Sequence, residues 1–149
     1  MFRARNSNPD SSGTSLHERV RAGLAQSFPG SLSNFSLGPS EADIVVHQGK
    51  RVAVFEVKTG DPDLPLPSST SAQMLLLREQ VRQQFPEGDV EEILPVVVTN
   101  YKVSPNDQKE LEHQGIKVVR IDPSTSRNYD FGKFSRQVAN LTGLQADLT

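Results

Sequence analysis

Three charged residues, Asp43, Glu56 and Lys58, lie within otherwise apolar runs of the sequence. Carboxylate oxygens are the ligands that Mg²⁺ prefers, and such sites keep several waters and bind substrate phosphates through the remaining positions. A lysine beside the metal supplies a fixed positive charge. These residue types therefore indicate metal-assisted hydrolysis of a phosphodiester, provided that the fold brings the three side chains together.

The stretch 42–58 is predicted to form a β-hairpin. Its segments 44–46 and 52–55 are apolar and mostly β-branched or aromatic. Between them, the pair Gly49-Lys50 is typical of a two-residue type II′ turn. A tight turn of this kind fixes which residues of the two strands stand opposite each other.

With this turn, Gln48 pairs with Arg51, and Asp43 then stands directly opposite Glu56. The Cβ atoms of opposed residues lie about 5 Å apart, where two carboxylates repel unless a cation neutralises them. Side chains alternate along a strand, so Lys58 shares a face with Glu56. A solvated pair of charges on a strand edge is the alternative, but the surrounding apolar residues indicate a strand that is covered on both faces.

The pattern D-x12-E-x-K across a hairpin resembles the catalytic core of the PD-(D/E)xK nuclease superfamily, which includes restriction endonucleases, Holliday junction resolvases and Mrr-type enzymes. The resemblance implies that Asp43, Glu56 and the backbone carbonyl of Val57 bind Mg²⁺, with Mn²⁺ as a substitute. It also implies that Lys58 orients or activates the attacking water. One departure is that Ala42 precedes the aspartate, where the family's name has proline.

The same resemblance implies two further catalytic residues. Many family members, resolvases in particular, carry a glutamate on the first helix that completes the metal site, and Glu18 matches it. A glutamine at the start of the helix after the E-x-K strand often hydrogen-bonds near the attacking water or the lysine, and Gln73 matches it. Helix capping explains Glu18 equally well, and a surface position explains Gln73. His17 lies nearer the apolar face of its helix and is predicted to pack there rather than to bind a ligand.

The elements around the hairpin are predicted from their own patterns. Ser15 and Glu18 have the spacing of a capping box and begin a helix that ends near Phe28. Further signals are apolar periodicity, a Pro-rich loop that cannot be helical, and caps with Pro or Gly. Among these caps, Ser104 before Pro105 is a predicted N-cap, and Gly115 is a predicted helix stop. These signals predict a strand over 31–38, a loop over 59–69, a helix over 70–85, a strand over 93–99 with Pro95 at its start, a helix over 105–114, a strand over 116–121 and a helix over 131–143.

These elements follow the order α-β-β-β-α-β-α-β-α. The strand, helix and strand over 93–121 predict a right-handed βαβ unit with parallel strands. Segment 96–122 is also similar to the second half of Mrr-type restriction endonuclease domains. The expected fold is therefore α/β, with a restriction endonuclease-like α-β-β-β-α-β core in which helices flank a mixed central sheet, and the resemblance covers residues 15–122.

Length and composition bound the interpretation. A chain of 149 residues is long enough for one domain, expected over 15–149 after a disordered N-terminal arm, residues 1–14. Sixteen basic and 18 acidic residues give a net charge of -2, which does not favour a nucleic-acid partner but is compatible with a local basic patch. The absence of cysteine excludes thiolate metal sites and cysteine nucleophiles, and three scattered histidines argue against a histidine-based zinc site.

The sequence therefore predicts a Mg²⁺-dependent endonuclease that hydrolyses phosphodiester bonds in DNA. Cleavage of RNA or tRNA in a toxin or defence system is an alternative among enzymes, and a catalytically inactive nuclease-fold module for binding or assembly is an alternative outside them. The expected partner is nucleic acid, above all DNA, and two cuts on a duplex would require a homodimer or a partner protein. No apolar run spans a bilayer and no secretory signal is visible, so a cytoplasmic location without membrane contact is expected.

Overall fold

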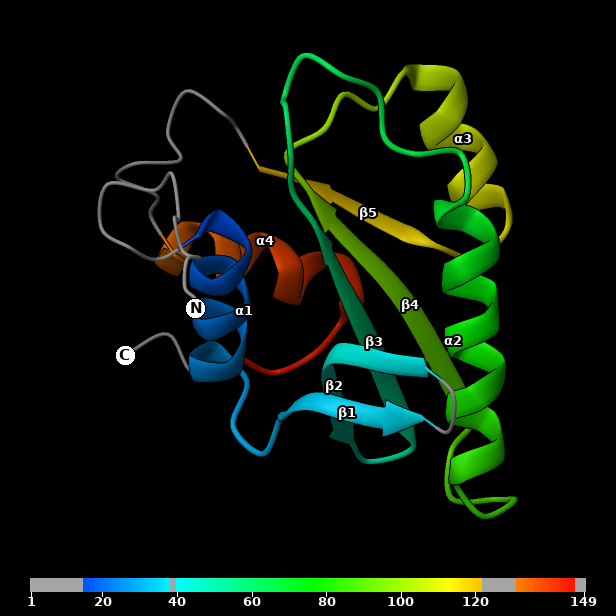
Figure 1. The fold of residues 1–149 in the computed structure, drawn as a ribbon. Coiled ribbons are helices and arrows are strands. Elements are labelled where there is room, and N and C mark those ends of the chain that lie inside the picture. Colours follow the sequence, from blue (N-terminus) through cyan, green and yellow to red (C-terminus); the bar gives the residue numbers. More distant parts are fainter. Residues whose placement is uncertain (1–14, 38–39, 122–130, 147–149) are drawn as a thin grey trace, which may run out of the picture.

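A computed structural model describes residues 15–37, 40–121 and 131–146, and the predicted arm over 1–14 lies outside these ranges. Helices cover both faces of a five-stranded mixed sheet (Figure 1). The strands are β1 (Leu32–Leu37), β2 (Ser40–Gln48), β3 (Arg51–Lys58), β4 (Glu92–Thr99) and β5 (Lys117–Arg120). The helices are α1 (Leu16–Ser27), α2 (Thr70–Gln84), α3 (Pro105–His113) and α4 (Phe131–Thr142).

The strands lie in the sheet in the order in which they occur in the sequence, β1-β2-β3-β4-β5. β1, β2 and β3 pair antiparallel, whereas β4 runs parallel to both β3 and β5. The α-β-β-β-α-β order and the mixed sheet flanked by helices confirm the predicted fold class. None of the described helices is long and apolar enough to cross a membrane.

Each face of the sheet has its own hydrophobic core. On one face, Leu24 of α1 and Val138 of α4 pack in one buried cluster with Phe55 of β3. On the other face, Met74 of α2 and Leu111 of α3 belong to a second cluster. Full burial of such side chains contributes about 1.5–3 kcal/mol each, so the two cores hold α1 and α2 firmly on opposite sides of β3.

The hairpin of β2 and β3 has the predicted register. Gly49 adopts a φ of 61°, as the first residue of a type II′ turn requires. Gln48 pairs with Arg51, and the ladder continues to Ile44 opposite Phe55. Extended by one position, this register brings Asp43 opposite Glu56, and the two carboxylates lie close enough to interact, as the sequence predicts.

The regular alternation of side chains breaks down at Asp43 and at its neighbour in β1. The register of β1 on β2 places Asn34 opposite Asp43, and Asn34 has a left-handed φ of 50°. Ile44 packs in the core beneath α1 and α4, whereas Ala42 packs in the core beneath α2. Residues two apart normally share a face, so the strands rotate here. As a result, the side chain of Asp43 does not join either core, and its carboxylate reaches the main chain of β3.

The caps of two helices agree with the sequence only in part. The hydroxyl of Ser15 accepts the N–H of Glu18 at 3.2 Å, and that of Ser104 accepts the N–H of Asp107 at 3.1 Å. The reciprocal half of the predicted capping box is absent from the described contacts, because the Glu18 carboxylate binds Arg21 instead. Glu18 is therefore held at the protein surface.

The expected position of Pro95 at the start of its strand is wrong. Pro95 is the fourth residue of β4 and pairs with Val54 of β3. The ladder between β4 and β5 begins only at Val96, so β4 has no partner on that side at Pro95. A proline, which has no N–H to donate, is tolerated in a strand where one edge is unpaired.

Candidate active site

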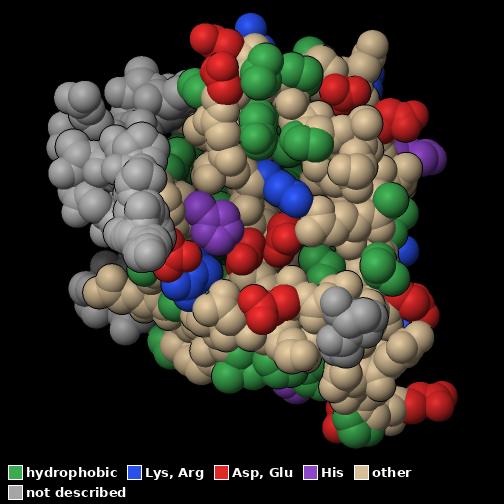
Figure 2. Space-filling model, in the orientation of Figure 1, with side chains coloured by type: hydrophobic (Ala, Val, Ile, Leu, Met, Phe, Trp, Pro, Cys, Tyr) green, Lys and Arg blue, Asp and Glu red, His purple; other side chains and the backbone are tan. Residues whose placement is uncertain are grey.

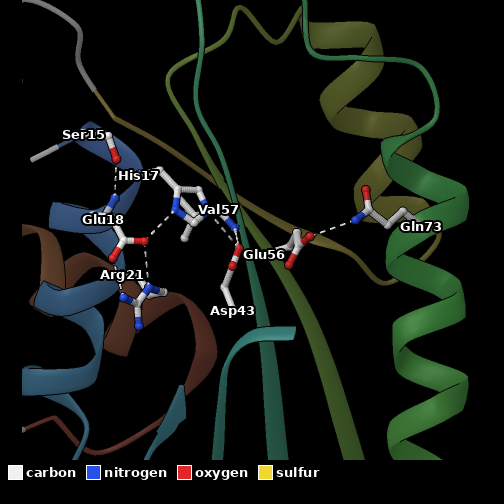
Figure 3. A network of polar contacts seen from close by, with 8 residues as sticks. All are labelled: Ser15, His17, Glu18, Arg21, Asp43, Glu56, Val57 and Gln73. Atoms are coloured by element: carbon white, nitrogen blue, oxygen red, sulfur yellow. Dashed lines mark hydrogen bonds and ion pairs between the residues drawn. The ribbon is translucent and has the colours of Figure 1, made fainter. Parts of the chain in front are cut away.

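The predicted acids meet where β2 and β3 separate, between α1 and α2 (Figure 3). Asp43 lies on β2, and Glu56 and Lys58 lie near the end of β3. In the space-filling view, acidic, basic and histidine side chains gather in a shallow hollow at the middle of this face (Figure 2). The structure therefore gathers the hairpin residues into one site.

Asp43 is held by hydrogen bonds from two elements. Its Oδ2 accepts the main-chain N–H of Val57 at 2.8 Å and lies 3.3 Å from Nε2 of His17. Burial alone would raise the pKa of Asp43, but the hydrogen bonds from His17 and Val57 outweigh it and leave the pKa below its ordinary value. Asp43 is therefore ionised at neutral pH.

Glu56 faces the opposite side of the site and has unusual electrostatics. The residue is only 9% exposed, and its Oε2 accepts a hydrogen bond from Nε2 of Gln73 at 2.8 Å. Its Oε1 is buried and has no hydrogen-bond partner among the described residues. Burial, together with the neighbouring charge of Asp43, raises the pKa of Glu56 to about 7. Glu56 is thus half-protonated near neutral pH.

Lys58 ends β3 two residues beyond Glu56 and lies on the same face of the strand. Its positive charge acts on Glu56 against the burial and the charge of Asp43, so it favours the ionised carboxylate. The side chain is partly exposed. An ammonium group in this position is close enough to influence groups bound between the two acids.

Gln73 contacts the acidic pair from α2. It lies in the first turn of α2 and donates to Glu56. This bond fixes Oε2 on the side of α2, whereas Oε1 is buried without a hydrogen-bond partner among the described residues. A catalytic role for Gln73 stays a prediction.

Glu18 is not brought to the acidic pair by any described contact. Its carboxylate forms an ion pair with Arg21, and its side chain is 49% exposed. Its other neighbour is His17, whose Nδ1 lies 3.6 Å from Oε1 of Glu18. Direct binding of a metal by Glu18 stays a prediction. The contact observed is with Nδ1 of His17, the ring nitrogen that does not face Asp43.

His17 is the residue that sequence reasoning missed. It is partly buried on the sheet-facing side of its helix, and its Nε2 contacts Asp43 from α1 (Figure 3), a contact that the sequence does not predict. The hydrogen bond to Asp43 raises the pKa of His17 despite its partial burial. The available signal is its position on the sheet-facing side of the helix, next to Glu18. A neutral imidazole is also a common metal ligand.

The residues present fit a hard divalent cation. Among the described residues no group of three or more His, Cys, Asp or Glu side chains is arranged to hold a metal. Mg²⁺ needs fewer protein ligands, because it keeps several waters and binds through one or two carboxylates plus substrate phosphate. Asp43 and Glu56 supply the two carboxylates, and the unpartnered Oε1 of Glu56 is an acceptor that a cation would satisfy. The carbonyl of Val57 points to the same side of β3 as its N–H, toward Asp43.

Comparison of the sequence with protein-family models and with curated proteins gives no match. Solved structures with a similar arrangement include a protein of unknown function, AF1548, with a TM-score of 0.52 and 18% identity over 70% of this chain and 57% of that one. Protein VC1899 from Vibrio cholerae has a TM-score of 0.51 and 13% identity over 86% of this chain and 32% of its own. A repair endonuclease from Pyrococcus abyssi has a TM-score of 0.44 and 15% identity over 62% of this chain and 37% of its own.

At these identities the likeness concerns the fold alone. The overlap with the repair endonuclease, at a TM-score of 0.44, is too weak to carry an argument. The chain spans between 32% and 57% of the length of these solved structures. The case for an activity therefore depends on the side chains of the site itself.

Proposed function

We propose that this chain is a metal-dependent nuclease that hydrolyses phosphodiester bonds, with DNA as its substrate. The observation that carries the proposal is the apposition of Asp43 with a buried Glu56 whose Oε1 has no described partner and whose pKa is raised to about 7. Two carboxylates kept this close destabilise each other unless a proton or a cation lies between them. Burial of such a pair has a cost in stability that a purely structural role does not explain.

Mg²⁺ or Mn²⁺ held by Asp43, Glu56 and the Val57 carbonyl would polarise the scissile phosphate and lower the pKa of a coordinated water. Gln73 holds Oε2 of Glu56 by a hydrogen bond and so limits rotation of this carboxylate. His17 and the Val57 N–H keep Asp43 ionised, so that this residue can bind a cation at neutral pH. The raised pKa of Glu56 means that it releases a proton when a cation binds.

Lys58 supplies the remaining group. Its ammonium lies on the Glu56 face of β3, at the open end of the strand, where it would orient the attacking water and offset the charge that develops on the phosphate. The same chemistry serves RNA as well as DNA. The choice of DNA follows the resemblance of the hairpin to DNA-cleaving enzymes, so the experiment includes both substrates.

The test is metal-dependent cleavage of plasmid DNA, single-stranded DNA and total RNA by the native chain and by Glu56→Ala and Lys58→Ala. Both substitutions are expected to abolish cleavage, since one removes a carboxylate of the pair and the other removes the positive charge that acts on Glu56 from the same strand. Cleavage of RNA but not DNA would move the proposal to the RNA alternative. Cleavage that survives in both variants would refute the assignment.

Matched controls come from the opposite end of the sheet, at the hairpin turn and just before β4. Glu91→Ala and Lys50→Ala remove an exposed acid and an exposed base that form an ion pair beside the hairpin turn. Both controls should cleave like the native chain, and all four variants should retain a cooperative thermal transition. A native chain that neither cleaves nucleic acid nor binds Mg²⁺ or Mn²⁺ would indicate the inactive binding module.

A further inference from the structure

The chain just beyond Lys58 is clamped to the end of β4 by a side-chain amide. Lys58 pairs with Thr99, the last residue of β4, and the ladder of β3 on β4 stops there. Asn100, which is buried, continues the pairing with its side chain. Its Oδ1 accepts the N–H of Gly60 at 2.9 Å, and its Nδ2 donates to the carbonyl of Gly60 at 2.9 Å.

A second contact leaves no room for a Cβ at position 60 unless the side chain of Tyr101 moves. A Cβ built there would lie 2.1 Å from Oη of Tyr101 and 2.5 Å from its Cζ. The phenol ring therefore rests directly on the main chain of Gly60. Tyr101 is held in turn, because its N–H binds the hydroxyl of Thr99 at 3.0 Å and its carbonyl accepts a hydrogen bond from Arg120 at 2.8 Å.

The loop after Gly60 is fixed to the same segment. The N–H of Leu66 binds the carbonyl of Lys102 at 2.9 Å, and the N–H of Lys102 binds the carbonyl of Leu64 at 2.9 Å. Pro65 and Lys102 form an isolated parallel bridge. The predicted Pro-rich loop over 59–69 is therefore hydrogen-bonded to the segment that follows β4, through the residues before and after Pro65.

We propose that Asn100 is a positioning residue for Lys58, acting through the main chain of Gly60. The reciprocal amide pair, which we call the Asn100 clamp, holds the main chain two residues beyond Lys58 against β4. The catalytic consequence of the clamp rests on the proposed function, whereas its effect on Lys58 does not. A group that orients a reacting water must be held to within about 0.5 Å, and Lys58 leaves β3 at the last paired residue, where a free strand end would fray.

The test compares Asn100→Ala with Gln48→Ala. Gln48 makes the same kind of contact at the far end of the hairpin, because its amide exchanges two hydrogen bonds of 2.8 Å with the main chain of Gln145. The two substitutions thus remove chemically equivalent amide pairs from one domain. Only the first lies beside Lys58.

Two measurements are made on each variant. The first is the order parameter of Lys58 from ¹³Cε relaxation, which requires no activity. The second is the kcat and KM of cleavage, together with the affinity for Mn²⁺. Asn100→Ala should lower the Lys58 order parameter and reduce kcat about 10- to 100-fold, the loss that follows when a catalytic group is misplaced by about 1 Å. Mn²⁺ affinity should change less than about twofold, because the two carboxylates are untouched.

Gln48→Ala should leave the order parameter, kcat and Mn²⁺ affinity at their native values. An unchanged Lys58 order parameter in Asn100→Ala would overturn the clamp, whatever the activity. A native chain without any cleavage would refute the proposed function, and the order parameter would still decide the clamp.

A second variant guards against misfolding of Asn100→Ala. Gly60→Ala keeps both hydrogen bonds available but introduces the Cβ that collides with Tyr101. It should mimic Asn100→Ala in both measurements, and the double variant Gly60→Ala/Tyr101→Ala should recover most of the loss because the collision is gone. Native behaviour of Gly60→Ala would count against the inference.

Discussion

Asp43 accepts the main-chain N–H of Val57 with its side chain, at 2.8 Å, where the register of the hairpin would otherwise bring Ala42 opposite Val57. The carboxylate replaces a backbone partner, so β2 can leave β3 without an unsatisfied buried N–H. The two strands separate at that residue. The acid pair of the candidate site therefore lies where the hydrogen-bond ladder of β2 and β3 ends. The pKa of Asp43 is lowered, and that of Glu56 is raised.

The raised pKa of Glu56 predicts how stability depends on pH without metal. Folding moves this pKa from an ordinary 4.5 to about 7, so the folded protein takes up a proton between these values. The contribution is fully present below pH 4.5 and is lost as the pH rises through 7. Glu56→Gln, which cannot ionise, should gain up to about 3 kcal/mol relative to the native chain between pH 5 and pH 8.

Urea unfolding at both pH values, with a chelator present, measures this difference. Glu91→Gln, at an exposed position outside the site, should keep the native pH dependence. A stability difference between Glu56→Gln and the native chain that stays constant over this range would mean that Glu56 is not protonated near neutral pH.

The charge of Asp43 is the second cause of the Glu56 shift, and Asp43→Asn isolates it. The asparagine oxygen can still accept the Val57 N–H, but the negative charge is gone. The pKa of Glu56 should then fall below about 7 and stay above 4.5, because burial, the larger cause, remains. A ¹³Cδ titration of Glu56 by NMR measures it. An unchanged pKa would show that the two carboxylates do not interact.

Sequence reasoning predicted the parts of this protein that depend on local rules. The turn at Gly49 fixed the hairpin register, and through it the apposition of Asp43 and Glu56. Capping at Ser15 and Ser104 gave the starts of two helices. Each of these features is decided by a few neighbouring residues, which is why a single sequence reveals them.

The remaining parts of the site depend on how distant elements pack. A helical pattern shows which side of α1 faces the sheet, but not which residue of β2 it meets, so Glu18 was chosen where His17 makes the contact. The left-handed φ of Asn34 cannot be predicted from the sequence pattern either, because the rule that side chains alternate along a strand assumes a regular backbone. The same holds for the placement of Ala42 and Ile44 in different cores. Asn100 followed a predicted strand and had no signal of its own.

The contact of His17 with Asp43 predicts a pH-dependent coupling. The hydrogen bond to Asp43 raises the pKa of His17, so its stabilising effect is fully present below 6.5 and is lost as the pH rises through the higher pKa of the folded state. A double-mutant cycle with His17→Ala and Asp43→Asn should give a coupling of about 1 kcal/mol at pH 6, modest because the ring is 34% exposed, and less at pH 9. Equal coupling at the two pH values would contradict this ion pair.

The backbone of Asn34 predicts a set of substitutions that links β1 to the site. At a φ of 50°, glycine is accommodated freely, whereas a β-branched residue is strained. Asn34→Val should therefore lower the free energy of unfolding by about 1–2 kcal/mol relative to Asn34→Gly in urea unfolding.

The same pair of variants tests whether β1 positions the site. Because the register places Asn34 opposite Asp43, relief of this strain by rotation of β1 would shift the carboxylate. Mn²⁺ affinity measured by calorimetry should therefore fall in the valine variant and persist in the glycine variant. Ser36→Val, in the same strand opposite Glu41, is the control and should change neither quantity to this extent. Equal stability of the two Asn34 variants would show that the left-handed backbone at this position does not constrain the site.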